Sequence, residues 1–114
     1  MEDKYNNILV SIKKLSGVAS FDDVFDADLL LFLNSNLLIL SQLGIEEVSS
    51  LTIDSTTNWT DIMPDGDLLG IIKCWMYLRV RMQFDPPSGS LASSIEELIK
   101  EYEWRISSRK DYES

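Results

Sequence analysis

Two consecutive prolines, Pro86 and Pro87, divide the second half of the chain into two helical segments. Proline fixes its own backbone and pushes the preceding residue out of the helical region, so the helix before them must end by Asp85. A new apolar helical period starts shortly afterwards, where Ser88 or Ser90 is placed to cap a helix. The sequence therefore predicts a rigid corner that joins two helices packed as an antiparallel or steeply crossing pair. The residues of this structural corner are Phe84, Asp85, Pro86 and Pro87.

Hydrophobic periodicity predicts helices over residues 3–16, about 27–43, from Asp65 or Asp67 to Phe84, and about 91–108. The second helix, with Asp26 or Asp28 as its expected cap, is apolar almost all round and should be central to the core or shared with a partner. Residues 45–64 have no helical period, and a connection of this length is usually functional or mobile. We therefore expect an all-α fold of about four helices in a small bundle, with a long loop between helices 2 and 3. The stretch "SLTID" in that loop is a candidate short strand.

The length of 114 residues fits one domain, 1–114, with a flexible C-terminal tail at about 108–114. The single cysteine, Cys74, has no partner for an internal disulfide. It stands in an apolar helical run, where a free thiol usually acts as a small buried hydrophobe. This cysteine usage suits a reducing cytoplasm.

Charge and hydropathy exclude two classes of partner. Acidic residues outnumber basic ones 19 to 10, for a formal net charge of −9, so tight binding to nucleic-acid phosphates is not expected. No apolar stretch is long enough to cross a membrane, so we expect no membrane partner. The bases are only partly clustered, at Lys13 and Lys14, Arg79 and Arg81, and Arg105, Arg109 and Lys110.

No arrangement of side chains in the sequence points to catalysis. The chain has no histidine, which is the commonest general base and metal ligand, and one cysteine does not make a structural zinc site. Asp61, Asp65 and Asp67 lie near a glycine, but no glutamate stands where a calcium loop of the EF-hand type needs it. We therefore expect no enzyme activity, no catalytic residues, no cofactor and no metal site.

Arg79 is the first residue that stands out as a contact residue, because it falls on the apolar stripe of the third helix. An arginine there must either extend to solvent or meet a carboxylate, which Asp85, Glu97 or Glu101 would supply across the corner. An internal ion pair that orients the helical hairpin is one interpretation. A contact between subunits is the other.

Trp104 is the second such residue, since it lies opposite Ile95 on the fourth helix and so on its polar face. Tryptophan is enriched in interface hot spots, although an incidental surface or capping role is an equal alternative. The apolar second helix and the loop with its isolated tryptophan add to a surplus of apolar surface that favours assembly. The candidate interface residues are Trp59, Arg79, Arg81, Trp104 and Arg105.

Four stretches of the chain together form a recognisable pattern: "LLLFLNSNLLILSQLGI" (29–45), "NWTDI" (58–62), "IKCWMYLRVRMQFDPPSGS" (72–90) and "IEELIKEYEWRI" (95–106). With these stretches the chain resembles the small helical head–tail connector proteins of tailed bacteriophages, also called adaptor or head-completion proteins. The strongest signal is "VRMQFDPP" followed by "EYEWR". The order is that of the family, with a helix, a loop with a lone tryptophan, a helix that ends at the prolines, and a helix that ends in Glu-Trp-Arg.

The resemblance implies a structural protein of the virion neck that is made in the host cytoplasm. Such proteins dock beneath the portal as a ring of about a dozen copies, which extends the DNA channel towards the tail and the next neck or tail-completion protein. DNA passes through such a ring without tight binding, which fits the acidic net charge. The alternative hypothesis is a small cytoplasmic helical protein-binding or regulatory module.

Overall fold

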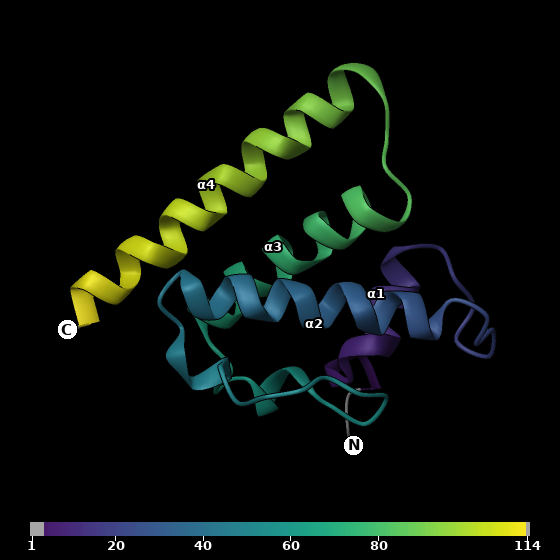
Figure 1. The fold of residues 1–114 in the computed structure, drawn as a ribbon, viewed down its shortest axis with the longest axis horizontal. Coiled ribbons are helices and arrows are strands. Elements are labelled where there is room, and N and C mark those ends of the chain that lie inside the picture. Colours follow the sequence, from purple (N-terminus) through teal and green to yellow (C-terminus); the bar gives the residue numbers. More distant parts are fainter. Residues whose placement is uncertain (1–3, 114) are drawn as a thin grey trace.

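The computed structural model describes the backbone of residues 4–113 and the side chains of residues 4–108. Over this range the chain is all helix and loop, which confirms the predicted fold class (Figure 1). The four α-helices are α1 (Ile8–Leu15), α2 (Asp26–Gln42), α3 (Asp67–Phe84) and α4 (Gly89–Glu113). Three short 3-10 helices accompany them, at Lys4–Asn6, Glu46–Val48 and Trp59–Asp61.

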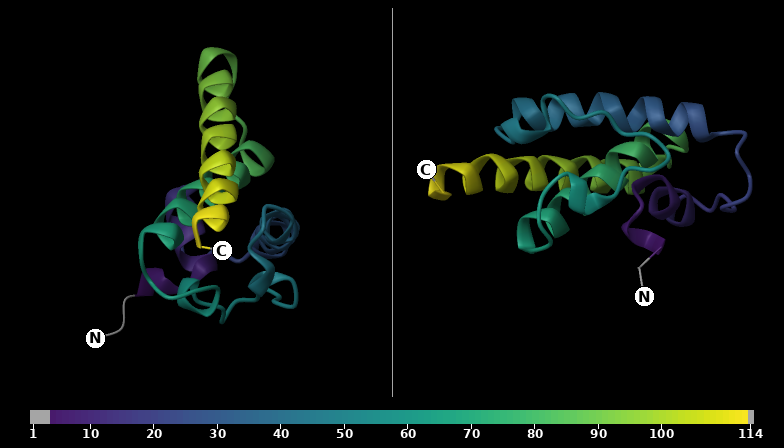
Figure 2. Two further views of the ribbon diagram at one scale, coloured as in Figure 1. Left: turned by 90° about the vertical axis from the view of Figure 1, so that its left-hand side faces the viewer. Right: turned by 90° about the horizontal axis from the view of Figure 1, so that it is seen from below.

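Helix α3 is the centre of the arrangement, because it packs against both α2 and α4. Helices α3 and α4 run in opposite directions on either side of the proline corner, as the sequence predicts (Figure 1, Figure 2). Fully buried side chains from α1, α2 and α3 meet in one core, and α4 adds to it through one face of its helix. The residues that α4 contributes are Ile95, Ile99 and Ile106.

Local signals explain where several helices begin and end. The side chain of Asn7 accepts a hydrogen bond from the backbone N–H of Val10 and caps α1. Beyond the end of α2, Gly44 has a φ of 111°, in the left-handed region that glycine adopts without strain. Helix α3 ends at Phe84, directly before Asp85 and the two prolines.

Two expected helix starts differ in detail. Asp26 is the first residue of α2 rather than its cap, and the residue before it, Phe25, makes no side-chain capping bond. Helix α4 begins at Gly89, so Ser90 lies inside the helix and Ser88 stands at the capping position. The aromatic rings of Phe25 and Phe84 also meet edge to face, with centroids 5.1 Å apart, which ties the start of α2 to the corner.

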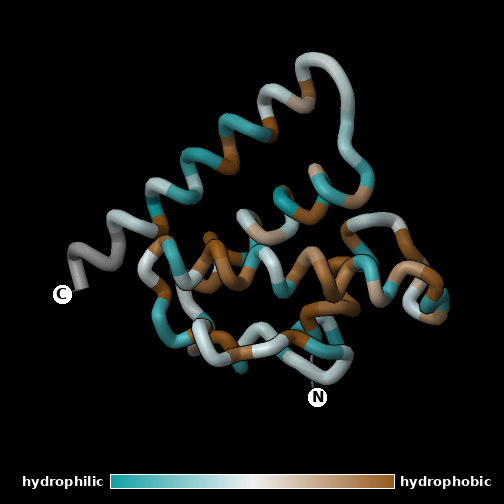
Figure 3. The backbone as a smooth tube through the Cα atoms, in the orientation of Figure 1, coloured by the Kyte–Doolittle hydropathy of each residue, from teal (hydrophilic) through white to brown (hydrophobic). Residues whose placement is uncertain are grey.

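Helix α4 is longer than the sequence predicts, because it continues to Glu113 instead of ending near residue 108. The flexibility expected of residues 108–114 stays a prediction, and Ser114 lies outside the described residues. Polar and apolar residues alternate along α4, whereas apolar residues follow most of α2 (Figure 3). The outward side of α2 carries Leu31 and Leu38, which are 66% and 62% exposed.

The long connection between α2 and α3 is packed against the body, and the short strand expected within it is absent from the described structure. Its only β-type pairing is an isolated bridge between Asn58 and Asn7. The amide side chain of Asn34 in α2 binds both the N–H and the carbonyl of Ile53, so this extended segment pairs with a side chain rather than with a strand. The connection buries five apolar side chains: Ile45, Val48, Ile53, Trp59 and Ile62.

Candidate protein interface

Arg79 lies at the centre of a polar cluster between α2, α3 and α4. Its Nε donates a hydrogen bond to Asn36 Oδ1 at 2.9 Å, and its Nη1 lies 3.5 Å from Glu103 Oε2. The same glutamate oxygen accepts a hydrogen bond from Trp75 Nε1 at 3.1 Å. The guanidinium also lies over the Trp75 ring, 5.6 Å from its centroid. Glu103 therefore accepts a hydrogen bond from Trp75 and forms an ion pair with Arg79, and through these two residues of α3 it attaches α4 to the core.

This geometry supplies the internal ion pair that was one interpretation of Arg79, but with a different carboxylate. The sequence pointed to Asp85, Glu97 or Glu101, whereas the partner is Glu103. Those three candidates are nearer to the corner in sequence. Arg79 instead meets a carboxylate farther along α4, and the spacing of residues in the sequence does not predict which turn of α4 faces Arg79.

Arg81, on another side of α3, has no ion pair among the described residues, and its Nε atom is buried without a hydrogen-bond partner there. It lines a small hollow of about 40 Å³ next to the corner. The Tyr77 hydroxyl in this hollow donates a hydrogen bond to the carbonyl of Leu15 and ties α3 to α1. The other residues that line the hollow are Ser16, Phe84 and Asp85.

Trp59, which the sequence offered as an interface residue, belongs to the core and is only 2% exposed. Its Nε1 donates a hydrogen bond to Ser11 Oγ at 2.9 Å, and the Lys73 amino group lies 5.9 Å from its ring centroid. The Trp59 indole ring therefore packs inside the monomer and is not exposed to a partner in this conformation. Cys74, which the sequence predicted to be buried, is exposed.

Trp104 and Arg105 lie on the solvent side of α4. The Trp104 side chain is 69% exposed, which agrees with its expected position opposite Ile95. Arg105 forms an ion pair with Glu101 one turn earlier, at 3.0 Å, with both side chains about half exposed. Such an exposed pair on one helix contributes only about 0.3–0.5 kcal/mol, so Arg105 is readily available to another carboxylate.

A second exposed surface was missed in the sequence, namely the acidic loop of residues 17–25 between α1 and α2. Phe21 is 89% exposed and Val24 is 73% exposed, and the carboxylates of Asp22 and Asp23 lie between them in sequence. The sequence signal for this exposed surface is the presence of aromatic residues within an acidic run.

The acidic loop is held at its base by Lys13, a charged residue that is only 3% exposed. Its Nζ donates a hydrogen bond to the carbonyl of Ser20 at 3.1 Å and lies 2.8 Å from Asp26 Oδ1. The carboxylate of Asp22 accepts a hydrogen bond from the N–H of Val24 and shapes the tip. These contacts order the loop, and its tip exposes two apolar side chains to solvent.

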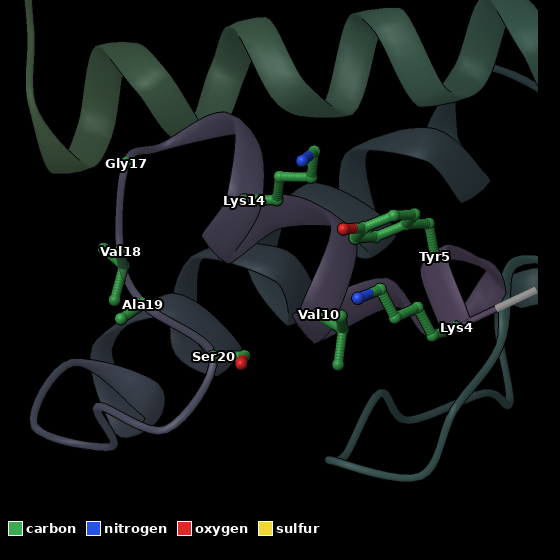
Figure 4. Close-up of a pocket in the computed structure, with 8 residues that line it drawn as sticks. All are labelled: Lys4, Tyr5, Val10, Lys14, Gly17, Val18, Ala19 and Ser20. Carbon is green, nitrogen blue, oxygen red and sulfur yellow. The ribbon is translucent and has the colours of Figure 1, made fainter.

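A basic hollow of about 360 Å³ lies beside the root of the same loop (Figure 4). The amino groups of Lys4 and Lys14 lie 5.1 and 5.0 Å from the centroid of the Tyr5 ring, on opposite sides of it. The Lys14 ammonium beside the phenol oxygen holds the pKa of Tyr5 below its usual value near 10. The remaining lining residues are Val10, Gly17, Val18, Ala19 and Ser20.

Within the described part of the chain, no group of three or more cysteine, aspartate or glutamate side chains is arranged to hold a metal ion. Every helix over residues 4–113 is too short or too polar to span a lipid bilayer. The surface features that remain are exposed apolar side chains next to charges, which is the chemistry of contacts between proteins.

Comparison with models of known families matches residues 8–113 to the family described as "Phage connector protein". No curated protein and no solved structure matches the chain. The family match covers all four α-helices, the proline corner and the packed connection between α2 and α3. The chain therefore belongs to the phage connector protein family, whose members are structural proteins that connect the head and the tail of a bacteriophage.

Proposed function

We propose that this chain is a ring-forming head–tail connector that docks beneath the portal and extends the DNA channel towards the tail. The observation that carries the proposal is the family match over residues 8–113, which leaves little of the chain for any other module. The ring has about a dozen copies, as the resemblance implies, and closes through head-to-tail contacts. The partners are other copies of the chain, the portal protein, and the next neck or tail-completion protein.

The surface of the subunit supports this proposal. Single exposed apolar side chains are common on any protein, whereas apolar side chains that gather on a surface mark contacts with other proteins. Here large exposed apolar side chains occur on the acidic loop, at the end of α1, on the outward side of α2 and on α4. The exposed ones outside the acidic loop are Leu15, Leu31, Leu38, Leu91, Leu98 and Trp104.

The net charge of −9 supports a conduit rather than a nucleic-acid-binding protein. An acidic wall repels the phosphate backbone, so DNA slides past it without adhering. In this proposal the protein is made and assembled in the host cytoplasm and becomes part of the neck of the virion.

Native mass spectrometry over a concentration series, of the protein alone and then mixed with the portal protein of the same phage, tests the proposal. A closed ring of about a dozen subunits, alone or on the portal, is the expected result. A monomer or a closed dimer under both conditions contradicts it. That outcome favours the alternative, a helical module that binds one partner.

A further inference from the structure

The acidic loop has the properties of a preformed ligand for another protein. Phe21 has the highest exposed fraction of the large apolar side chains, at 89%. The backbone around it is fixed by the Lys13 contacts at its base and by the turn hydrogen bonds from Asp22 N–H to Ala19 O and from Asp26 N–H to Asp23 O. A loop already ordered in the free subunit loses little conformational entropy on binding, which strengthens a contact.

The surface around Trp104 has the complementary properties. We call it the Trp104 face, and it consists of Lys100, Trp104, Arg105 and Ser108 on α4. The indole offers a broad apolar surface for an aromatic ring. Lys100, one turn before Trp104, is exposed and has no ion pair among the described residues, and Arg105 has only its weak pair with Glu101. Two cations thus flank an exposed aromatic ring.

The two surfaces lie on opposite sides of the subunit. The acidic loop, drawn in dark blue between α1 and α2, lies at one side of the view in Figure 1, and the yellow C-terminal part of α4, from about residue 100 onwards, extends towards the other side (Figure 1, right-hand view of Figure 2). The subunit measures 42 × 39 × 25 Å along its principal axes. Two different surfaces on opposite sides of a subunit make a head-to-tail contact, and such contacts give a ring when the rotation from one copy to the next closes.

We propose that the acidic loop of one copy docks on the Trp104 face of the next copy, with Phe21 and Val24 against Trp104 and with Asp22 and Asp23 facing Lys100 and Arg105. This assignment rests on the proposed ring and names its subunit contact. Apolar contact supplies the affinity, and the opposite charges fix the register.

The basic hollow at Lys4 and Lys14 is another cationic surface that faces solvent, but it suits a different symmetry. It lies beside the root of the acidic loop, since residues 17–20 line it. A loop that enters this hollow of another copy brings the same ends of two copies together. That arrangement is a two-fold dimer, which does not continue into a ring.

Cysteine pairing in a Cys74→Ser background tests the contact directly. One preparation carries Val24→Cys and another carries Ser108→Cys. Mild oxidation is expected to give a cross-linked dimer only when the two are mixed under conditions in which the wild-type protein assembles, alone or on the portal. The control partner is Ser50→Cys, an exposed position in the connection between α2 and α3, which should give no product with Val24→Cys. Cross-linking of Val24→Cys with itself overturns the proposal in favour of the two-fold dimer.

Charge exchange provides a second, independent test. Asp22→Lys with Asp23→Lys, and separately Lys100→Glu with Arg105→Glu, should each weaken self-association by about tenfold or more. An equimolar mixture of the two variants should assemble again, because each reversed surface then meets its complement. Restored assembly also shows that both variants are folded.

The outcomes separate this inference from the proposed function. If wild-type protein forms rings and both charge-reversed variants form them equally well, the contact is elsewhere and only this inference fails. If wild-type protein neither self-associates nor binds the portal, the proposed function fails and the inference fails with it.

Discussion

At the scale of single residues, Trp75 and Trp104 show two opposite uses of the same side chain. Trp75 is fully buried, with its Nε1 bound to Glu103, whereas Trp104 is 69% exposed. Burial determines the cost of truncation, because a cavity forms only where a side chain was enclosed.

Trp104→Ala should therefore leave the free energy of unfolding of the monomer within about 0.5 kcal/mol of wild type. The same change should weaken assembly by about 2 kcal/mol or more, since exposed aromatic residues in interfaces are typical hot spots. Urea unfolding and sedimentation measure the two effects separately. Trp75→Ala is the matched control, with an expected loss of about 3–5 kcal/mol in unfolding. A loss of stability in Trp104→Ala as large as its loss of assembly would place Trp104 in the core.

Glu103 is the residue that attaches α4 to α3 by polar contacts. Glu103→Ala removes the acceptor of the buried Trp75 Nε1 and the carboxylate partner of Arg79. We expect a loss of about 1–3 kcal/mol in the free energy of unfolding, because a buried donor is left unsatisfied. Glu97→Ala, an exposed glutamate of the same helix with no ion pair in the described structure, should change it by about 0.5 kcal/mol or less. Equal effects for the two variants would show that the cluster adds nothing to stability.

At the scale of elements, the acidic loop depends on one buried lysine. Lys13→Met keeps the length of the side chain but leaves the Asp26 carboxylate and the Ser20 carbonyl without their cation. The expected result is faster proteolysis within residues 17–25 and a loss of about 1–3 kcal/mol in unfolding. Lys14→Met removes an exposed amino group that lies beside Tyr5, and should cost less than about 1 kcal/mol. Unchanged proteolysis in Lys13→Met would mean that the loop is ordered by other contacts.

The two prolines of the corner are expected to stabilise the protein through their effect on the unfolded chain. Replacing both Pro86 and Pro87 with Ala should lower the free energy of unfolding by about 1–2 kcal/mol, because the prolines restrict the unfolded state without losing a native hydrogen bond. The melting temperature reports the change, and Pro64→Ala, outside the corner, gives the effect of a single proline. An unchanged melting temperature in the double variant would show that the Phe25–Phe84 contact and the flanking helices hold the corner alone.

At the scale of the whole molecule, the acidic charge predicts how the protein behaves towards DNA. Fluorescence anisotropy with a short duplex at about 150 mM salt should give a Kd weaker than about 0.1 mM, which is the weak end of non-specific binding. Lowering the salt should change little, because few phosphates are neutralised. A steep salt dependence with micromolar affinity would mean that the few bases form a working DNA surface, and the picture of a non-adhesive conduit would be wrong.

Several features of the fold follow from the sequence by itself because their causes are local. The prolines end α3 at Phe84, Gly44 follows the end of α2, and the spacing of apolar residues gives the four helices. The same spacing placed Trp104 on the solvent side of α4. Each of these signals acts over a few residues, within one turn of helix or one bend.

Only the tertiary structure decided which residues meet across the chain. It placed Trp59 in the core against Ser11, gave Arg79 the carboxylate of Glu103, and buried Lys13 beneath the acidic loop. These contacts join positions far apart in sequence, or depend on what covers a residue once helices pack, and local periodicity carries no information about either. For the same reason the sequence offered both Trp59 and Trp104 as interface candidates, and only the packed structure shows that Trp59 is buried and Trp104 is exposed.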